Sequence, residues 1–599
     1  MGAGWIDGNR IRFRLGHPES IRGWEKATSE AFLGIARTLY KFADNSGNLY
    51  TAIGTSKKFY VESGGTLTDI TPIRDTNTLG ADPITTVDLS STVTITDVAH
   101  GATAGDYVII SGATAFNGIA IEALNQEFEI LSVPTADTYT VETSDAANAS
   151  GAGGGAAVQA EYLYYTGTNS TIYGTGWGTG TWGRGTWGSS YVGSAFATDT
   201  LRIWSCDNFG EDLVFNPRGG PIFYWDATTP TARGVDIGTL SGATDTPEVA
   251  IQALVSQQSR HVIAIGPNTL GTAIQDKMLV RWSDSEDVAD WTPTTINSSG
   301  DYVLNRGSEI ITAVQLRSDI LIYTDQAMYL MQYIGGQFVF GFTVIANNIY
   351  LAGRNAVVSV GDSAYWFGSA GFYVYDGRVS EIPCPLERWL LEDVDTDNGD
   401  KIYACTNTLC HEITWFYQSV DSATDEVDKY VTLNYEEQVW YYGELARTAW
   451  IEDTISVYPV AASPDGYLYS HEGVSTDGST EPASDIGAWI QSGPIELGSG
   501  DNFVFVDRII PDVNFTGSLD STTPTVDLTL SARNWPGAAD FDPETHSISR
   551  LTVSPDTFTN KKNVRLRGRT ISLRADSGGT GSIWRLGDIR ADFRPDGSK

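Results

Sequence analysis

Short apolar runs separated by turn residues fill most of the chain, with few stretches at helical spacing. Residues 364–383 read AYWFGSAGFYVYDGRVSEIP and predict a meander of three antiparallel strands joined by tight turns. Asp376 and Gly377 predict a type I′ hairpin turn, because both central positions of that turn need φ > 0. One such meander cannot cover its own apolar faces and needs a neighbour. The predicted strands are residues 365–367, 372–375 and 378–383.

Similar units recur tens of residues apart, which predicts a β-propeller whose blades cover one another's faces. The alternative is another antiparallel β-fold, since any such fold contains hairpins of this kind. The further units are residues 49–72, 213–226, 320–340 and 459–473. We expect an N-terminal strand and first blade in 1–81, an inserted domain in 82–160, a Gly/Trp-rich connecting loop in 161–197, and the remaining blades with C-terminal closing strands in 198–599.

The interruption at residues 82–160 predicts a small β-barrel or sandwich inserted after the first blade. Four strands are expected, and the Gly/Ala/Ser tract 146–157 predicts a flexible linker that returns to the blades. The strands are residues 93–98, 106–110, 127–133 and 138–142.

Composition supports an all-β fold of two or three domains. The 599 residues exceed one ordinary core, and 17 Trp, 28 Tyr and 63 Gly are typical of sheets and turns. Four cysteines without a CxxC pair predict neither a disulfide scaffold nor a zinc site. We expect no targeting signal and no membrane span, because no apolar run approaches the roughly 18 residues that a span requires.

Charge is strongly negative and unevenly distributed. The formal net charge is −36, which predicts solubility and, as the functional alternative, a surface that repels nucleic acid. Residues 550–599 differ, because eleven Lys and Arg against five Asp give this segment a net charge of +6. Such asymmetry would suit docking against an acidic neighbour, including a second copy of the chain.

Two stretches near the ends of the chain alternate arginine with apolar residues or glycine, at the period of a strand. The arginines would therefore share one face of each strand. That face is either a solvated edge, which discourages aggregation, or a docking surface for carboxylates, which the planar guanidinium binds in bidentate fashion. The residues are Arg10, Arg12 and Arg14 at the start and Arg565, Arg567 and Arg569 near the end.

The segment IYGTGWGTGTWGRGTWGSS, residues 172–190, places Trp177, Trp182 and Trp187 five residues apart, each followed by Gly. One interpretation is a stacking platform for sugars or bases. The favoured interpretation is a loop whose Trp side chains fill an interface between blades or subunits, since Trp is enriched at interfaces.

Catalytic and metal-binding patterns are absent from the sequence. The six His are scattered, and neither GxSxG nor GxxxxGK occurs. Residues 392–400 resemble a calcium loop, but Gly399 stands one place late and Ala404 occupies the twelfth position. We therefore expect no catalytic residue, cofactor or metal, and no enzyme activity. A carboxylate pair for glycoside hydrolysis needs no fixed spacing, so Glu211, Asp212, Glu436 and Glu437 stay open as candidates.

Three stretches resemble the tail tube, hub or nozzle proteins of short-tailed bacteriophages, also called phage stabilisation proteins. They are GWIDGNRIRFRLGHPESIRGWEK at 4–26, RWSDSEDVADWTP at 281–293 with GDYVL at 300–304, and SIWRLGDIRADFRPDGSK at 582–599. Together they span the whole chain.

The resemblance implies a propeller-containing subunit of a hexameric ring in the virion, at the distal end of the tail. Such a ring lines the channel through which double-stranded DNA leaves, helps to retain the genome, and meets an adaptor or portal-side protein and a tail fibre or needle protein. The subunit would be made in the bacterial host cytoplasm. No catalytic residue is implied. The alternative is a propeller glycosidase or lectin-type adhesin that acts on host surface polysaccharide.

A DNA channel also makes a prediction about charge. Each phosphate neutralised by Lys or Arg would add affinity through counterion release, so a basic channel would retain DNA. We expect the acidic excess to include the channel wall.

Overall fold

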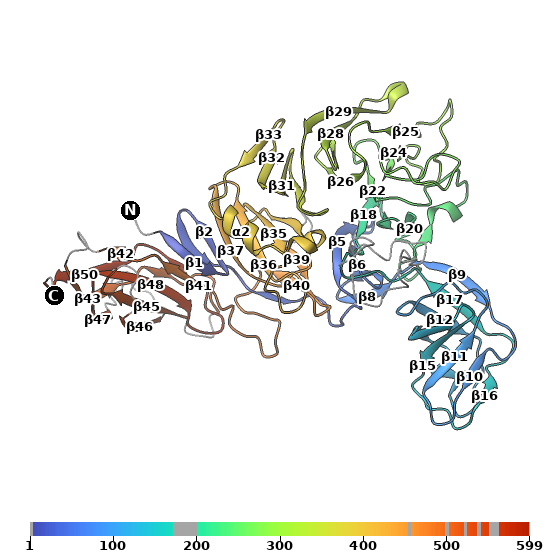
Figure 1. Cartoon of the computed structure of the whole chain (residues 1–599), viewed down its shortest axis with the longest axis horizontal. Coiled ribbons are helices and arrows are strands. Elements are labelled where there is room, and N and C mark those ends of the chain that lie inside the picture. Colours follow the sequence, from blue (N-terminus) through green and yellow to red (C-terminus); the bar gives the residue numbers. More distant parts are fainter. Residues whose placement is uncertain are drawn as a thin grey trace, which may run out of the picture. The chain divides into compact units, whose positions relative to one another are not determined.

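The computed structural model describes residues 4–171, 201–452, 457–496, 502–519, 524–535, 541–549 and 562–597 (Figure 1). Within them the chain is almost entirely β, and the two α-helices, Ile121–Leu124 (α1) and Glu387–Asp393 (α2), are short. The chain divides into two compact units. The first unit comprises Met1–Ser29 with Leu351–Lys599, and the second unit is Glu30–Tyr350.

The described residues of the second unit form four four-stranded antiparallel meanders, numbered here as its first to fourth blades. The first is β5 (Ala36–Ala43), β6 (Leu49–Thr55), β7 (Phe59–Ser63) and β8 (Thr66–Asp69). The second is β18 (Trp204–Phe209), β19 (Asp212–Pro217), β20 (Phe223–Trp225) and β21 (Val235–Asp236). The third is β22 (Gln252–Val255), β23 (Val262–Ile265), β24 (Leu279–Trp282) and β25 (Gly300–Val303). The fourth is β26 (Ile310–Gln315), β27 (Ile320–Thr324), β28 (Ala327–Tyr333) and β29 (Phe340–Asn347).

The first unit contains three further blades, and an N-terminal strand completes the last of them. Strand β4 (Trp24–Lys26) pairs with β40 (Leu468–His471) of the last blade, where Trp24 stands opposite His471. One blade is β30 (Val357–Val360), β31 (Ser363–Gly368), β32 (Gly371–Tyr375) and β33 (Val379–Ile382). The next is β34 (Tyr403–Asn407), β35 (Glu412–Tyr417), β36 (Lys429–Asn434) and β37 (Val439–Glu444). The last is β38 (Ala449–Ile451), β39 (Val460–Ala462), β40 (Leu468–His471) and β4.

Each blade of the second unit shares a hydrophobic cluster with the next, so apolar faces cover one another. Phe59 of the first blade stacks on Phe215 of the second, with ring centroids 4.2 Å apart. This packing explains why the meander recurs. The all-β fold class predicted from the sequence, with propeller blades and a small inserted β-domain, is confirmed.

Polar contacts join the leading strands of successive blades in the second unit. The Thr38 hydroxyl donates to the Trp204 carbonyl at 2.7 Å, which joins β5 to β18. The Val255 amide donates to the Asp207 carboxylate at 2.8 Å, which joins β18 to β22. These bonds satisfy backbone groups that the buried strands cannot expose to water.

The meander predicted at residues 364–383 is real, but its details differ from the prediction. A fourth strand, β30, precedes it, and Tyr375 pairs with Val379 across a three-residue loop. Gly377 has φ 100°, whereas Asp376 does not take a positive φ. The predicted type I′ turn is therefore wrong, because a three-residue hairpin loop needs only one residue of that kind.

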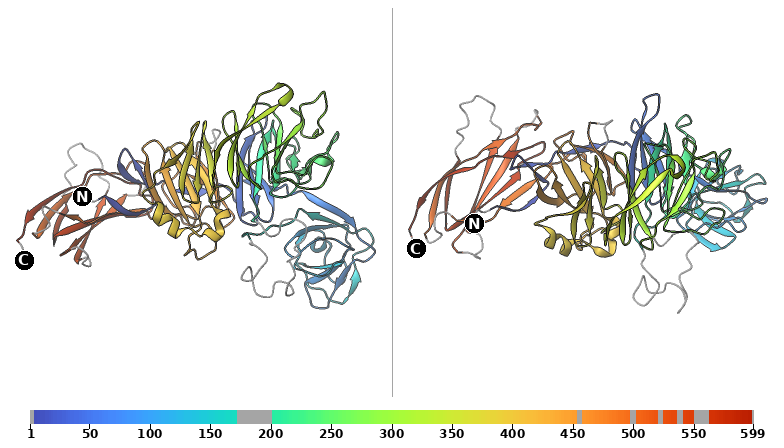
Figure 2. Two further views of the ribbon diagram at one scale, coloured as in Figure 1. Left: turned by 45° about the horizontal axis from the view of Figure 1, so that its top comes forward. Right: turned by 90° about the horizontal axis from the view of Figure 1, so that it is seen from above.

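The insertion in the second unit is a sandwich of two sheets around one core (Figure 2). The sheets have the orders β13-β12-β17-β9 and β14-β15-β11-β10-β16. Part of the tract predicted as a flexible linker forms β16, where Gly153 leaves room for the Phe116 ring, so that prediction is wrong. The strands are β9 (Ile73–Thr78), β10 (Ile84–Thr86), β11 (Thr92–Thr96), β12 (Tyr107–Ser111), β13 (Glu127–Glu129), β14 (Ser132–Thr135), β15 (Thr138–Glu142), β16 (Gly151–Gly153) and β17 (Gln159–Leu163).

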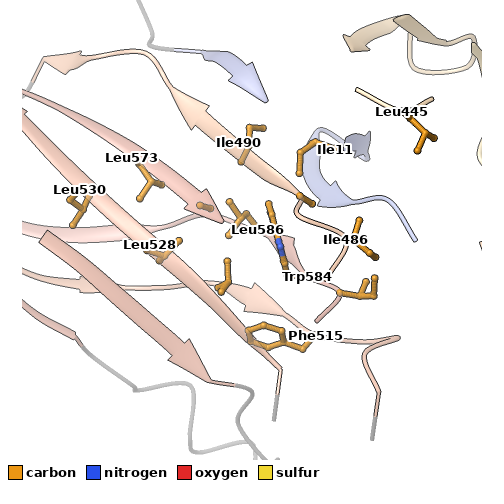
Figure 3. Packing of buried hydrophobic residues seen from close by; sticks show 14 of the residues in the cluster. Ile11, Leu445, Ile486, Ile490, Phe515, Leu528, Leu530, Leu573, Trp584 and Leu586 are labelled. Carbon is orange, nitrogen blue, oxygen red and sulfur yellow. The ribbon is translucent and has the colours of Figure 1, made fainter. Parts of the chain in front are cut away.

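The remaining strands of the first unit pack the two ends of the chain together around a core that includes Ile11, Ile490, Leu528 and Trp584 (Figure 3). Three sheets contribute, with the orders β1-β41-β48-β45-β46, β47-β43-β50 and β2-β3-β49-β44, and β42 pairs with β48. The strands are β1 (Trp5–Asn9), β2 (Ile11–Arg14), β3 (His17–Ser20), β41 (Trp489–Ser492), β42 (Ile495–Glu496), β43 (Val504–Ile510), β44 (Val513–Asn514), β45 (Thr525–Arg533), β46 (Phe541–Ser549), β47 (Lys562–Gly568), β48 (Thr570–Ser577), β49 (Arg585–Leu586) and β50 (Arg590–Pro595).

Candidate subunit interface

Arg12, predicted to dock an acidic neighbour, is buried in the first unit and is 6% exposed. It lies on β2, and its guanidinium binds two carboxylates of the same chain in bidentate fashion. Glu412 opens β35, and Glu472 directly follows β40. The contacts are Nε–Oε1 of Glu412 at 2.8 Å, Nη2–Oε2 of Glu412 at 3.2 Å, Nη1–Oε2 of Glu472 at 2.8 Å and Nη2–Oε1 of Glu472 at 2.6 Å.

Neighbouring groups complete this buried cluster. The Tyr441 hydroxyl donates to Oε1 of Glu412 at 2.5 Å, and Nδ2 of Asn407 donates to Oε2 of the same carboxylate at 3.2 Å. Burial raises the pKa of Glu412, with Arg12 acting in the opposite direction. Burial lowers the pKa of Arg12, but both carboxylates more than offset this and the pKa is raised well above its ordinary value.

Arg12 therefore stays charged and joins the N-terminal hairpin β2–β3 to two blades. The prediction that Arg12 docks another protein is therefore wrong, because its side chain is buried. The chemistry expected of it, bidentate binding of carboxylates, is present, but the carboxylates belong to its own chain.

Arg10 and Arg14 differ from Arg12 and from each other. Arg10 directly precedes β2 and has φ 56°. Its side chain donates to the carbonyls of Glu444 and Ile486. Its guanidinium carbon lies 5.3 Å from the centroid of the Trp24 ring. Arg14 ends β2 with an exposed side chain. Of the three N-terminal arginines, only Arg14 is exposed at a surface.

The C-terminal arginines follow the predicted alternation. On β47, Arg565 is exposed and Arg567 is half-buried, whereas Val564 and Leu566 face the core. Arg569 follows the last residue of the strand, Gly568, and is also half-buried. Strand β47 pairs with β43 and belongs to a different sheet from β2, so the two arginine strands do not lie side by side in one sheet.

Aromatic rings lie among these arginines. The guanidiniums of Arg567 and Arg569 lie 4.0 and 5.0 Å from the Phe503 ring, and that of Arg594 lies 4.9 Å from the Phe505 ring. Phe505 stands between Arg567 and Arg594 in the strand register, which places these groups on one side of the sheet. We call this surface the arginine–phenylalanine face; it comprises Arg565, Arg567, Arg569, Arg594 and the half-buried Phe505, with the buried Phe503 ring beneath Arg567 and Arg569.

Aspartates reduce the positive charge of this surface. Nε of Arg567 donates to Asp596 at 2.6 Å, Nε of Arg594 lies 3.5 Å from Asp507, and Arg508 pairs with Asp592. Sequence reasoning missed the rings and the carboxylates because β43 and β50 are separated from β47 along the chain. Every residue of the edge strand β50 is exposed.

Trp177, Trp182 and Trp187 lie outside the described residues, so their predicted interface role stays a prediction.

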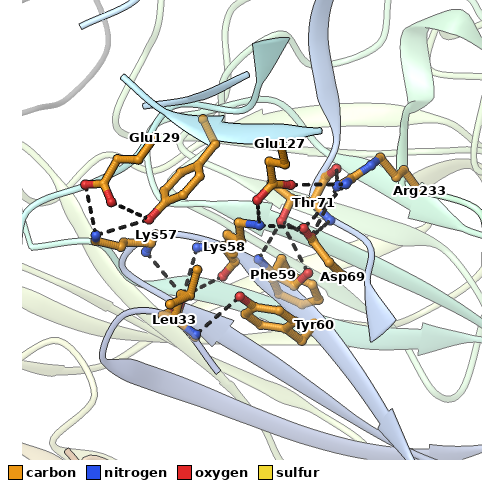
Figure 4. Close-up of polar contacts among 12 residues, drawn as sticks. Leu33, Lys57, Lys58, Phe59, Tyr60, Asp69, Thr71, Glu127, Glu129 and Arg233 are labelled. Atoms are coloured by element: carbon orange, nitrogen blue, oxygen red, sulfur yellow. Dashed lines mark hydrogen bonds and ion pairs between the residues drawn. The ribbon is translucent and has the colours of Figure 1, made fainter. Parts of the chain in front are cut away.

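A polar network in the second unit joins the first blade to the inserted sandwich (Figure 4). Nζ of Lys58 lies 2.9 Å from Asp69 and also pairs with Glu127 of β13. Arg233 lies 3.2 Å from Asp69. Burial raises the pKa of Asp69, but Arg233 and Lys58 outweigh it and the pKa is lowered. These ion pairs form within the chain and connect the blade to the inserted sandwich.

The acidic run at 392–400 supplies intrachain contacts in place of a calcium loop. Asp393 binds Nζ of Lys429 at 2.8 Å, and Asp400 accepts from Arg354 at 3.0 Å. No group of three His, Cys, Asp or Glu residues that could hold a metal occurs among the described residues. In that same part of the chain, no helix is both long and apolar enough to cross a membrane.

Comparisons with known proteins supply no family. No family model and no curated protein matches the chain. Among solved structures, the phage phi92 endosialidase aligns over 72% of this chain and 63% of its own length, less than two thirds, at 11% identity and a TM-score of 0.21. The AfRom2 CNH domain aligns over 44% of this chain and 91% of its own, at 7% identity and a TM-score of 0.23. PorZ, a surface component of the type IX secretion system of Porphyromonas gingivalis, aligns over 94% and 86% of the chains, at 9% identity and a TM-score of 0.29.

Proposed function

We propose that this chain is a structural subunit of a bacteriophage tail nozzle, or hub, which forms a ring around the channel for DNA. The proposal starts from three sequence stretches, 4–26, 281–293 with 300–304, and 582–599, that resemble such proteins. A ring subunit needs a rigid body and surfaces that meet its neighbours. The blades are suited to the first task, and the arginine–phenylalanine face is suited to the second.

The arginine–phenylalanine face is the observation that carries the proposal. Arginine and aromatic residues are enriched at protein interfaces, where each offers a large contact area and fixed geometry. Here the rings and guanidiniums already lie against one another, so little side-chain freedom would be lost on docking. The partner would be an acidic surface of the adjoining subunit or of the adaptor ring.

The net charge of −36 suits a channel wall that DNA must pass without binding. On this proposal the wall would carry few unpaired Lys or Arg side chains. Fibre or needle proteins would attach to the outside of the ring.

Electron microscopy of the purified full-length chain tests the proposal. We expect closed rings at low salt, and particles of single subunits when salt is raised, since screening weakens exposed ion pairs. Single subunits at every salt concentration, together with cleavage of a bacterial polysaccharide, would contradict the proposal and favour the glycosidase or adhesin alternative.

A further inference from the structure

A polar cavity of about 430 Å³ lies between the second and third blades of the second unit. This volume falls within the roughly 300–1,000 Å³ that small-ligand sites occupy. The lining comes from the end of β18, the end of β22 and the loops that follow β22 and β24. It includes Asn208, Phe209, Ser256, Gln257, Arg260 and Glu286.

Two residues of the lining have a strained backbone. Arg260 has φ 51° and Glu286 has φ 60°, a region that residues other than glycine rarely adopt. The Glu286 amide donates to the Arg260 carbonyl at 2.9 Å, and the Arg260 amide donates to the Ser256 carbonyl at 2.8 Å. These bonds hold both residues at the cavity, and strain maintained in this way is concentrated at functional sites.

The charges of this pair cancel at the cavity. Nη1 of Arg260 lies 3.2 Å from Oε1 of Glu286, and both side chains are about two-thirds exposed, at 66% and 68%. Because each ion has the other as its partner, neither is left to balance an ionised ligand. Both still have further donor or acceptor positions for uncharged groups.

Hydrogen bonds fix the position of Asn208, which lines the cavity, and of its neighbour Asp207. Oδ1 of Asn208 lies 2.6 Å from the Tyr40 hydroxyl oxygen, and its Nδ2 donates to the Gly210 carbonyl at 3.1 Å. Asp207, next to Asn208, is buried and accepts from Tyr40 at 2.8 Å. A rigid wall reduces the entropy lost when a ligand binds.

We propose that this cavity binds one uncharged saccharide unit of a polysaccharide. A sugar hydroxyl both donates and accepts, which matches a lining that mixes amide, hydroxyl, guanidinium and carboxylate groups. Phe209 offers apolar surface for the C–H face of a sugar ring. The proposal goes beyond the ring function and does not depend on it.

Saturation-transfer difference NMR of the full-length chain tests the proposal, since it detects weak binding to large assemblies. The probes are the methyl glycosides of glucose, galactose and N-acetylglucosamine, with glucuronate as an anionic probe. We expect saturation transfer to at least one neutral glycoside. Replacing both side chains, Gln257→Ala with Arg260→Gly, should reduce the signal about tenfold, because glycine suits the backbone at 260 and the polar contacts are lost.

The matched control is Arg317→Ala, which removes another exposed arginine of the second unit and should leave the signal unchanged. If the double variant does not fold, as judged by circular dichroism, Gln257→Ala alone takes its place and should lower the signal in the same direction, because the amide that faces the sugar is lost. Absence of transfer to all neutral glycosides, an unchanged signal in the cavity variant, or preference for glucuronate would each overturn the proposal.

Discussion

Two strands of the first unit carry the same alternation of arginines, yet their side chains have opposite environments. On β2, Arg12 is buried between Glu412 and Glu472. On β47, Arg565 is exposed, and Arg567 meets an aspartate that is itself half-exposed. The period of a strand shows which side chains share a face, but it does not show what covers that face.

The two sites also differ in where their acidic partners lie in the sequence. The partners of Arg12 come 400 and 460 residues later, at the start of β35 and just after β40. The carboxylate that binds Arg567 is Asp596, which comes only 29 residues later, just after β50. Burying an arginine without carboxylates would cost several kcal/mol, so its two partners are a condition of the fold.

The largest effect is expected at Arg12. Arg12→Met would leave two carboxylates buried without a cation and should destabilise the first unit by about 3–5 kcal/mol. Denaturant unfolding measures the loss, and hydrogen exchange of β35 and β40 shows where it falls. The control is Arg14→Met on the same strand, expected within about 0.5 kcal/mol of the unchanged protein because its side chain is exposed.

A triple change sharpens that result. Replacing Arg12, Glu412 and Glu472 together with methionine removes all buried charges, so most of the lost stability should return. If the triple variant is as unstable as Arg12→Met, the loss comes from packing and the charge argument is wrong.

A buried carboxylate without a cation should behave differently from Glu412. Asp207 accepts from Val255, Tyr40 and Asn208, and burial raises its pKa from 3.8 to about 6. Because the folded state holds the proton more tightly, the stability that Asp207 contributes is full below about pH 4 and is lost as pH rises through about 6.

Asp207→Asn should remove this dependence. The difference in unfolding free energy between pH 4 and pH 7 should shrink by roughly 2–3 kcal/mol. The cost of the altered hydrogen bonds is the same at both pH values and does not enter this difference. Calorimetry across this range measures the change, with Asp376→Asn as the control at an exposed loop. An unaltered pH profile would show that Asp207 does not titrate in this window.

The smallest effect on folding is expected for the three arginines on and just after β47. Replacing Arg565, Arg567 and Arg569 with Gln should change the stability of the subunit by about 0–1 kcal/mol per exposed pair at most. On the proposed function, the same variant should assemble less well and be more sensitive to salt. Arg388→Gln, at a side chain that is 93% exposed, is the control. Assembly of the triple variant with the salt tolerance of the unchanged protein would show that the face is only solvated.

Much of the fold could be predicted because hairpin turns are local. All five meanders identified in the sequence lie in four-stranded sheets, since Gly and Asp-Gly mark their turns. The third blade of the second unit was not singled out, because the long loop at 266–278 separates its strands. Strand β4 joins β40 over more than four hundred residues, a pairing without any local signal.

The candidate interface could be predicted only in part. The alternation at residues 565–569 placed Arg565, Arg567 and Arg569 on one face, since a strand has a period of two, although β47 itself ends at Gly568. The Phe503 and Phe505 rings were missed because the register of β43 against β47 cannot be read from either strand. The same limitation hid the two carboxylates that bind Arg12.

Sedimentation velocity of the purified full-length chain, measured from low to high salt, tests the central claim that this is a ring subunit. The account predicts a closed assembly near six times the subunit mass of 64.8 kDa at low salt, which dissociates as salt rises. A species of single-subunit mass at every salt concentration would contradict it.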